Sequence, residues 1–456
     1  MTSPIRPIVL STTRSICPVC FTQLSATRQR EGEAIYQVKT CPEHGTFRTV
    51  IWRDQPEFEG WQRPKTPSLP KKPFTSRSKG CPLDCGLCPN HKQHTCTALL
   101  EITHRCNLHC PVCFADAEQT SAEQDPSLER ISFWYDRIVE GSGFCNIQLS
   151  GGEPTVRNDL DAIIALARAK GFNFVQLNTN GLRLAADPTY ARTLKEAGLA
   201  SVFLQFDGLT PKVHQALRGR DLVRIKKQAV ENCARAELGI VLVPTLVPGL
   251  NTDQIYPIIE FAVHHAPAVR GVHFQPVSYF GRYPAPPDNR DRLTLPEILT
   301  LIQQQSQGAI QAEWFAPPAC EHALCSFHAA FLIDEQAQLN PLSAGQSACC
   351  SQGQEQVPSA REGREKSITF TARQWSHPLP LAQPVASSKP LDDLDRFLLR
   401  AKTHTFSLSG MAFQDAWNLD IERLQGCCIH IVSPQGNLVP FCSYNLTSSQ
   451  GVSLYR

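Results

Sequence analysis

The cysteines of this chain lie almost entirely toward its two ends, and this distribution limits what the chain can fold into. Of 19 cysteines, ten lie in the first 113 residues and seven follow residue 319. A chain of 456 residues buries a core without disulfides, and closely spaced cysteine pairs in such a chain indicate metal ligands. We therefore expect metal binding at both ends. Cys145 and Cys233, alone in the middle, are expected to be buried apolar residues.

Composition narrows the class of protein further. The net charge is only +2, which argues against a nucleic-acid partner held by bulk electrostatics. No apolar run approaches the roughly 18 residues that cross a bilayer. The N-terminus lacks an apolar segment long enough for a signal peptide. We expect a soluble, cytoplasmic protein without a transmembrane segment and without a nucleic-acid partner.

Strand and helix patterns alternate about six times over residues 97–310. Such alternation predicts a parallel sheet with right-handed crossovers. Six βα units are too few for a closed eight-stranded barrel, so the expected fold class is α/β, an open, partial (βα)6 barrel similar to a TIM barrel. The expected strands are 98–103, 147–149, 172–177, 201–206, 240–246 and 272–277, and the expected helices are about 127–140, 158–170, 188–197, 222–238, 253–265 and 295–306.

The regions that flank this core have different compositions. Residues 1–61 are expected to form a Cys-rich metal-ribbon module, 62–79 a Pro-rich linker with an extended polyproline II path, and 80–96 an auxiliary-cluster segment. Residues 311–456 form a less regular C-terminal region. Within it, 340–390 is rich in Ser, Gln and Pro and is expected to be loop-like, whereas 426–444 has the pattern of a hairpin.

The spacing C-x3-C-x2-C occurs twice, and three thiolates so spaced can hold three irons of a [4Fe–4S] cluster. The second triplet directly follows the first strand of the βα series, so its loop lies at the functional end of the strands. No further cysteine follows until residue 145, which leaves one iron open. The first triplet has Cys96 nearby, which predicts a closed auxiliary cluster. The two sets are Cys106, Cys110 and Cys113, and Cys81, Cys85, Cys88 and Cys96.

The segment TALLEITHRCNLHCPVCFADA, which contains the second triplet, resembles the radical S-adenosylmethionine (SAM) superfamily. Ser150-Gly151-Gly152-Glu153-Pro154 follows the second strand and resembles the GGEP motif of that family, which contacts the amino group of SAM. Two glycines allow a close approach of the backbone to a ligand, and Glu153 can accept from an ammonium. One departure is Val112, because the family often has an aromatic residue at that position, and here Phe114 follows the third cysteine instead.

The resemblance implies a mechanism and a set of contacts. In the family, the open iron binds the amino and carboxylate groups of SAM, and an electron cleaves SAM to a 5′-deoxyadenosyl radical. A flavodoxin or a ferredoxin-type protein is the implied electron donor. Ser150 to Glu153, with Asn180, Gln205 and Asp207, are candidates to contact SAM or the substrate. Gln205 and Asp207 are also the only candidates for a catalytic role, although Asn and Asp before Gly commonly form caps and turns.

Three further segments, LQFDGLTPKVHQALRG, VPTLVPGLNTDQI and FQPVSYFGR, resemble one subgroup of that family. It contains archaeal tetraether lipid synthases and methylases of 7,8-dihydro-6-hydroxymethylpterin, a methanopterin precursor. The resemblance implies hydrogen abstraction from an unactivated carbon, followed by C–C bond formation or methylation. The substrate would be a lipid-like or pterin-like small molecule.

Subgroup members carry additional metal sites, and the flanks of this chain contain suitable ligands. Cys17, Cys20 and Cys41, with His44 or a remote cysteine, suit a tetrahedral zinc ion or a rubredoxin-like iron. A C-terminal auxiliary [4Fe–4S] cluster is expected from Cys320, Cys325, Cys428 and Cys442. Cys427 is the alternative to Cys428, and Cys349 and Cys350 compete as ligands.

Two other functions fit parts of the pattern. A radical SAM enzyme that modifies a peptide would also carry C-terminal auxiliary clusters, but residues 1–61 resemble a metal ribbon more than a peptide-binding module. A non-enzymatic electron carrier with several clusters would need neither an open-iron triplet nor six βα units. The radical SAM enzyme that acts on a small molecule is therefore the leading hypothesis.

Overall fold

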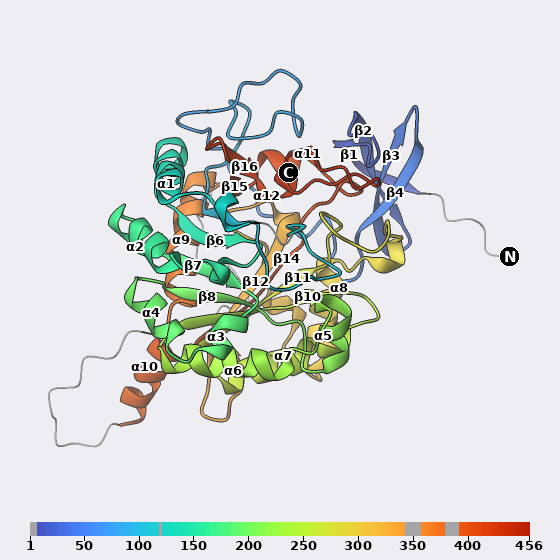
Figure 1. The fold of residues 1–456 in the computed structure, drawn as a ribbon. Coiled ribbons are helices and arrows are strands. Elements are labelled where there is room, and N and C mark those ends of the chain that lie inside the picture. The colour runs from blue at the N-terminus through green and yellow to red at the C-terminus, as the bar shows by residue number, and fades with distance from the viewer. Residues whose placement is uncertain (1–6, 118–120, 343–356, 379–391) are drawn as a thin grey trace.

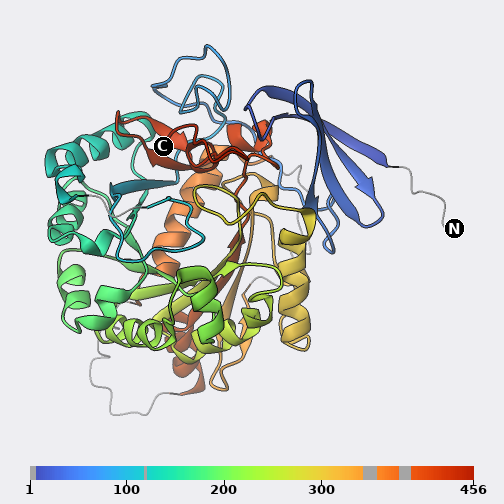
Figure 2. The same ribbon diagram turned by 45° about the vertical axis from the view of Figure 1, so that its right-hand side comes forward.

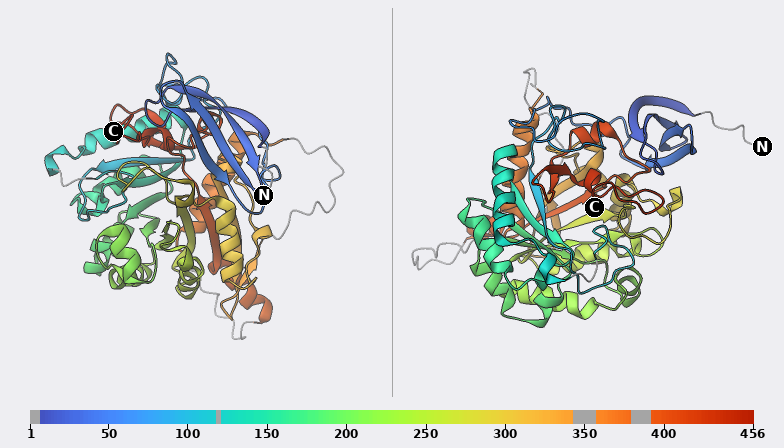
Figure 3. Two further views of the ribbon diagram at one scale, coloured as in Figure 1. Left: turned by 90° about the vertical axis from the view of Figure 1, so that its right-hand side faces the viewer. Right: turned by 45° about the horizontal axis from the view of Figure 1, so that its top comes forward.

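The computed structural model describes residues 7–117, 121–342, 357–378 and 392–456. The chain forms a small N-terminal sheet and a much larger second sheet (Figure 1). Helices form an outer layer around the large sheet, and the small sheet lies beside it (Figures 2 and 3). Within the described residues, no helix is both long enough and apolar enough to cross a membrane.

The small sheet is an antiparallel meander of four strands that packs against the C-terminal region. Its strands are β1 (Ile8–Ile16), β2 (Gln23–Glu31), β3 (Ala34–Cys41) and β4 (Gly45–Trp52). Buried polar side chains make the contact: Lys39 Nζ donates to the Ala416 carbonyl at 3.0 Å, and Gln37 donates to the Leu419 carbonyl at 2.8 Å. These buried bonds attach the module to residues 416–419.

Six parallel strands in sequence order form the centre of the large sheet, as the sequence predicts. They are β5 (Thr97–Thr103), β6 (Asn146–Gly151), β7 (Val175–Thr179), β8 (Ser201–Gln205), β9 (Gly239–Val243) and β11 (Val269–Pro276). The short β10 (Thr245–Leu246) also pairs with β11. The expected α/β class and partial barrel are confirmed, although the third strand begins three residues later than expected.

The outer helices follow from amphipathic periodicity and from local caps. In α1, the residues Ile131, Trp134, Tyr135 and Ile138 form the buried face, and Ser127 Oγ caps the first turn by accepting from the Arg130 amide. The helices of this layer are α1 (Leu128–Ser142), α2 (Leu160–Ala169), α3 (Leu182–Ala186), α4 (Tyr190–Glu196), α5 (Pro211–Arg218), α6 (Val223–Arg235), α7 (Ile255–His264) and α8 (Leu295–Gln305).

Strands from the C-terminal region extend the sheet at both edges, which the sequence did not predict. At one edge, β14 (Thr405–Met411) pairs parallel with β11, followed by β12 (Ser326–Ile333) and β13 (Leu339–Pro341). At the other edge, β15 (Ile429–Val432) pairs parallel with β5 and forms the expected hairpin with β16 (Leu438–Pro440). Both edges of the six-stranded core are therefore paired.

Part of the segment that was expected to be loop-like forms a helix. α9 (Ala360–Trp375) lies within 340–390, so that prediction is wrong for these residues, and residues 343–356 and 379–391 lie outside the described part. Its apolar periodicity is weak, and its clearest local signal is the capping box of Ser359 and Glu362. α10 (Asp393–Thr403) and α11 (Ile421–Gln425) follow, and α12 (Phe441–Tyr444) ends the helices.

α9 is attached to the residues that begin the parallel strands. The buried Arg364 donates to the carbonyls of Thr95 at 2.6 Å, Ser142 at 3.2 Å and Phe144 at 2.6 Å. At the other end of α9, Gln374 and Arg270 exchange hydrogen bonds with each other's backbone carbonyls at 3.1 and 3.0 Å. The helix therefore covers the N-terminal edge of the sheet.

Replacement of Arg364 by Ala is expected to destabilise the protein by about 3 kcal/mol, because three backbone carbonyls, two of them in buried contacts, lose their donor. Urea unfolding measures the change. Arg361→Ala is the matched control, since Arg361 lies on the exposed side of the same helix and pairs with Glu365, and it should cost less than about 0.5 kcal/mol. Equal effects of the two substitutions would show that α9 is not held by Arg364.

Candidate functional site

The C-terminal ends of the parallel strands surround a cavity of about 200 Å³. Its wall contains all three cysteines of the second triplet and the whole Ser150–Glu153 turn. Asn180 and Gln205 also line it, whereas Asp207 does not. Val112 and Phe114 both border the cavity, and Phe114 packs against Phe441 with ring centroids 5.7 Å apart.

Three sulfur donors on one wall of a partly enclosed cavity suit an iron–sulfur cluster. Burial raises the pKa of Cys106 to about 12, and burial also raises the pKa of Cys110, which the charge of Arg218 opposes. Arg218 donates to the Val112 carbonyl at 3.2 Å, so a cation lies beside the thiol loop. Because the pKa of Cys110 stays raised beside this cation, bound metal is needed for Cys106 and Cys110 to lose their protons near pH 7.

Glu153 joins two neighbouring strand ends. One carboxylate oxygen accepts from Thr155 Oγ1 at 2.6 Å and from Thr179 Oγ1 at 2.7 Å. The other oxygen accepts from the Asn180 amide at 2.7 Å. Because both oxygens are engaged and the side chain is 1% exposed, Glu153 fixes the turn in place. The contact of Glu153 with a SAM ammonium stays a prediction.

The structure explains why two positions of the turn are glycine, which the sequence alone did not reveal. A Cβ on Gly151 would lie 2.1 Å from the Thr103 carbonyl oxygen, and a Cβ on Gly152 would lie 2.2 Å from that of Arg105. Gly151 also has φ +124°, which disfavours any other residue. The glycines therefore allow the turn to pack against the loop that carries the cysteines, and they bring the two motifs together.

Asp207 and Arg218 form a buried ion pair at the wall of the cavity, which Arg218 lines. Two hydrogen bonds of 2.7 Å join them, and Asp207 also accepts from the Thr245 amide at 3.0 Å. Burial favours the neutral acid, but the charge and hydrogen bonds of Arg218, the charge of Lys226 and the Thr245 amide together outweigh this effect and lower the pKa of Asp207. When the side-chain amide of Gln205 is oriented so that its oxygen faces donors, this oxygen accepts from Arg218 Nε at 3.1 Å. Asp207 therefore acts on the cavity through Arg218.

Asn180 has the capping geometry that the sequence left open as an alternative. Its side-chain oxygen accepts from the Leu182 amide at 3.0 Å, and its Nδ2 donates to Asn107 Oδ1 at 2.7 Å. Asn107 lies inside the cysteine loop, next to Cys106. Asn180 thus connects the end of β7 to that loop while it lines the cavity.

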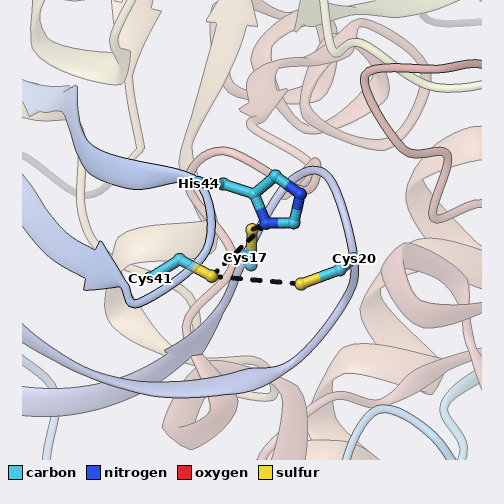
Figure 4. A group of neighbouring side chains, drawn as sticks. All are labelled: Cys17, Cys20, Cys41 and His44. Atoms are coloured by element: carbon cyan, nitrogen blue, oxygen red, sulfur yellow. Dashed lines mark hydrogen bonds between the residues drawn. The ribbon is translucent and has the colours of Figure 1, made fainter.

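The ribbon module brings its four predicted ligands together (Figure 4). His44 Nδ1 lies 3.7 Å from Cys17 Sγ and 3.5 Å from Cys41 Sγ, and the sulfurs of Cys20 and Cys41 are 4.0 Å apart. Ligands of a tetrahedral zinc ion lie about 3.5–4 Å from one another, given Zn–S and Zn–N bonds of about 2.3 and 2.0 Å. The hydrogen bond from His44 lowers the pKa of Cys41 to about 7. The geometry fits one tetrahedral ion.

Cys96 lies in a different group from the one predicted for it. Its sulfur is 3.2 Å from Cys428 Sγ, and the sulfur of Cys320 completes a buried group of three. Strand pairing explains the correction: β15 pairs with β5, with Ile429 opposite Thr97, so that the preceding residues Cys428 and Cys96 are neighbours. The sequence revealed the hairpin but not the strand that it joins.

The other predicted sets are also rearranged. Cys85 interacts with both Cys81 and Cys88, whereas Cys96 lies with Cys320 and Cys428. Cys325 and Cys442 do not belong to the Cys96–Cys320–Cys428 group, so the predicted C-terminal set is divided. Burial raises the pKa of Cys442 to about 12, and its charged neighbours include Cys325 and Arg423. Electrostatic interactions also link Cys427 to Cys325 and Cys442.

Four other cysteines complete the comparison with the sequence. Cys145 and Cys233 are buried in the core, as predicted. Cys349 and Cys350 lie outside the described residues.

Two family models match this chain. One is described as the radical SAM superfamily and matches residues 100–262, which contain the cysteine triplet and the glycine-rich turn of the cavity. The other is described as the HMPTM N-terminal zinc ribbon domain and matches residues 9–53, which contain all four ligands of the ribbon group. Both matches coincide with sites that the geometry defines.

Similar proteins include one that aligns along nearly the whole chain. A 7,8-dihydro-6-hydroxymethylpterin dimethyltransferase of Methanocaldococcus jannaschii is 34% identical, over 96% of this chain and 94% of that protein. A probable GTP 3′,8-cyclase of Methanothermobacter marburgensis is 29% identical over 38% of this chain and 55% of that protein. Among solved structures, Streptococcus suis SuiB bound to S-adenosylmethionine covers 48% of this chain and 47% of its own, with 13% identity and a TM-score of 0.38.

The substitution Asp207→Asn is expected to lower the free energy of unfolding by about 3–5 kcal/mol, because it leaves the Arg218 charge buried without its partner. Asp136→Asn is the control, because Asp136 is 64% exposed and pairs with Lys170 at the surface, where the loss should be below about 1 kcal/mol. Urea unfolding of both variants tests the difference. A loss at Asp207 no larger than at Asp136 would contradict a structural role for this pair.

Proposed function

This chain belongs to the radical SAM superfamily, in the subgroup of pterin methylases, and we propose that it methylates a carbon atom of a reduced 6-hydroxymethylpterin. The main support is the relative that is 34% identical over 96% of this chain and whose name states that activity. The chain is an enzyme that transfers methyl groups, so the electron-carrier hypothesis does not hold. Lipid-like and peptide substrates have no comparable support from the similar proteins.

A [4Fe–4S] cluster and SAM are the cofactors of this superfamily, and the residues that line the cavity at the strand ends suit both. Cys106, Cys110 and Cys113 would hold three irons, because these three thiols share one wall of the cavity. The Ser150–Glu153 turn lies on the same cavity and is held rigidly by Thr155, Thr179 and Asn180. When bound and reduced, the cluster supplies the electron that cleaves SAM to methionine and a 5′-deoxyadenosyl radical.

The protein itself contributes position and charge to this site. Arg218, fixed by Asp207, places a permanent positive charge next to Cys110 and Cys113. This charge favours the thiolate forms that bind iron. Asn180 and Glu153 hold the ends of β6 and β7 against the cysteine loop, so that the geometry of the cavity is fixed before ligands bind. Gln205 faces both the cavity and Arg218.

We further propose the occupants of the other thiol groups. The ribbon group of Cys17, Cys20, Cys41 and His44 suits zinc, in agreement with the family model for residues 9–53. Cys96, Cys320 and Cys428 would hold an auxiliary [4Fe–4S] cluster, and the Cys81–Cys85–Cys88 triplet is a candidate for another. The enzyme requires an electron donor, for which we propose a flavodoxin or a ferredoxin-type protein.

The direct test of this function uses the anaerobically reconstituted enzyme with dithionite, SAM, 7,8-dihydro-6-hydroxymethylpterin and a cell extract as the source of any additional methyl donor. Mass spectrometry should detect 5′-deoxyadenosine and a pterin heavier by one or two methyl groups. Cys106→Ala should abolish both products, because the cluster loses a ligand. The buried core variant Cys233→Ala should retain both. Formation of 5′-deoxyadenosine by wild type without any methylated pterin would reject the proposed substrate.

The ribbon site has its own prediction. The substitution Cys41→Ser should lower bound zinc by one equivalent per chain, because a hydroxyl is a much weaker zinc ligand than a thiolate. Elemental analysis measures zinc and iron together. Iron content should stay at the wild-type value, since Cys41 belongs to no other described thiol group. Loss of iron with unchanged zinc would contradict the zinc assignment.

A further inference from the structure

A second cavity, of about 330 Å³, lies beneath the first one inside the sheet. Gln148, Phe203, Gln275 and Phe413 line both cavities, so the two share a boundary within the sheet. Neither the Ser150–Glu153 turn nor the Cys106–Cys113 loop reaches the second cavity. The proposed SAM site therefore leaves this second space without an assigned function.

Alternation of side chains along the strands explains how one interior has two compartments. On β8, Phe203 and Gln205 point inward, and on β11, His273 and Gln275 do so. In each pair, the residue nearer the start of the strand lines the second cavity, and the residue nearer its end lines the first. The second cavity thus lies on the α9 side of the first, and it is reached from the opposite edge of the sheet.

Aromatic rings in fixed orientations line the second cavity. The ring centroids of Phe203 and Trp375 are 5.6 Å apart, and His273 lies 5.4 Å from Phe203. Trp375 Nε1 donates to Ser407 Oγ at 3.2 Å, and His273 Nδ1 bonds Ser409 Oγ at 2.8 Å. Hydrogen bonds therefore hold two of these three rings. Fixed aromatic faces suit the binding of a flat ligand.

Uncharged polar groups accompany the rings. Among the described residues, none forms a hydrogen bond with the side-chain amide of Gln275, which borders both cavities. Burial lowers the pKa of His273 to about 4, so its ring is neutral at pH 7 and can donate or accept through Nε2. The Gln275 amide and His273 can therefore pair with donors and acceptors on the edge of a bound ligand.

The second cavity reaches the surface beside α9. Lys366 and Phe370 line it and are themselves exposed, and Phe370 is 44% exposed although it is aromatic. Both belong to α9, which covers the N-terminal edge of the sheet. The first cavity, by contrast, lies at the C-terminal edge. The interior therefore has an opening on the side away from Cys106, Cys110 and Cys113.

We propose that the second cavity binds the ring of the pterin that accepts the methyl group, and that this pterin enters beside α9 while SAM occupies the first cavity. A pterin is flat and carries both donors and acceptors on its edge, and these features suit the fixed rings and the unpaired side-chain amide of Gln275. Cys96 and Glu321 also line this cavity, so the bound ring lies between Cys96 and the Cys106–Cys113 loop. The inference rests on the proposed function and assigns the acceptor site of that reaction.

The test uses 6-hydroxymethylpterin, the stable and fluorescent oxidised form, as a binding probe for the reconstituted enzyme. Binding should quench the fluorescence of Trp375. The substitution Trp375→Leu should lower the affinity for the probe about 10-fold, because a stacked ring is lost. Thr371→Trp places bulk in the second cavity and should abolish probe binding. Thr369→Trp is the matched control, because Thr369 lies on the exposed side of α9 and does not line this cavity.

Two readouts separate this inference from the proposed function. The affinity for SAM and the formation of 5′-deoxyadenosine without pterin should be unchanged in Thr371→Trp, which shows that this variant is folded and carries its cluster. Absence of 5′-deoxyadenosine in wild type would reject the proposed function. The inference about the cavity would be overturned if both variants, Thr371→Trp and Trp375→Leu, bound the probe as tightly as wild type does. It would also be overturned if the active wild-type enzyme bound no probe at millimolar concentration.

Discussion

The register of the parallel strands determines where the reactive side chains of this protein lie. Thr103 stands opposite Gly151 across β5 and β6, so the cysteine loop and the glycine-rich turn emerge side by side. On the other side of β5, Thr97 stands opposite Ile429, which places Cys96 next to Cys428. A shift of one residue in either pairing would turn the inward side chains of the shifted strand outward and separate the two motifs that this pairing brings together.

This arrangement places thiol groups at the two ends of one interior. Cys106, Cys110 and Cys113 border the cavity at the C-terminal ends of the strands, and Cys96 borders the cavity at their beginnings. Gln148, Phe203 and Gln275 lie between them. If SAM and the acceptor enter from opposite edges, each can exchange without displacing the other, and the reacting atoms stay shielded from water by the outer helices and α9.

The sequence predicted what depends on local pattern. The six parallel strands follow from alternating strand and helix signals, and the cavity motifs follow from cysteine spacing and from Ser150-Gly151-Gly152-Glu153. The cysteine partners were not predictable in the same way, because Cys96 meets Cys428 only through a strand pairing between residues more than 300 positions apart. α9 was missed because its composition resembles a loop and its helix signal is a single capping box. The roles of Glu153 and Asp207 also needed the structure, since only hydrogen-bond partners distinguish a ligand contact from a positioning contact.

Isotope transfer tests the central claim, that radical chemistry on a pterin occurs inside this sheet. The substrate would be 7,8-dihydro-6-hydroxymethylpterin with deuterium at every carbon-bound hydrogen, and the measurement is the mass of the 5′-deoxyadenosine formed during turnover. The account predicts 5′-deoxyadenosine that carries deuterium, together with a methylated pterin that has lost one deuterium for each methyl group gained. Methylated pterin formed together with deuterium-free 5′-deoxyadenosine would contradict the account, because the radical would then not react with the pterin.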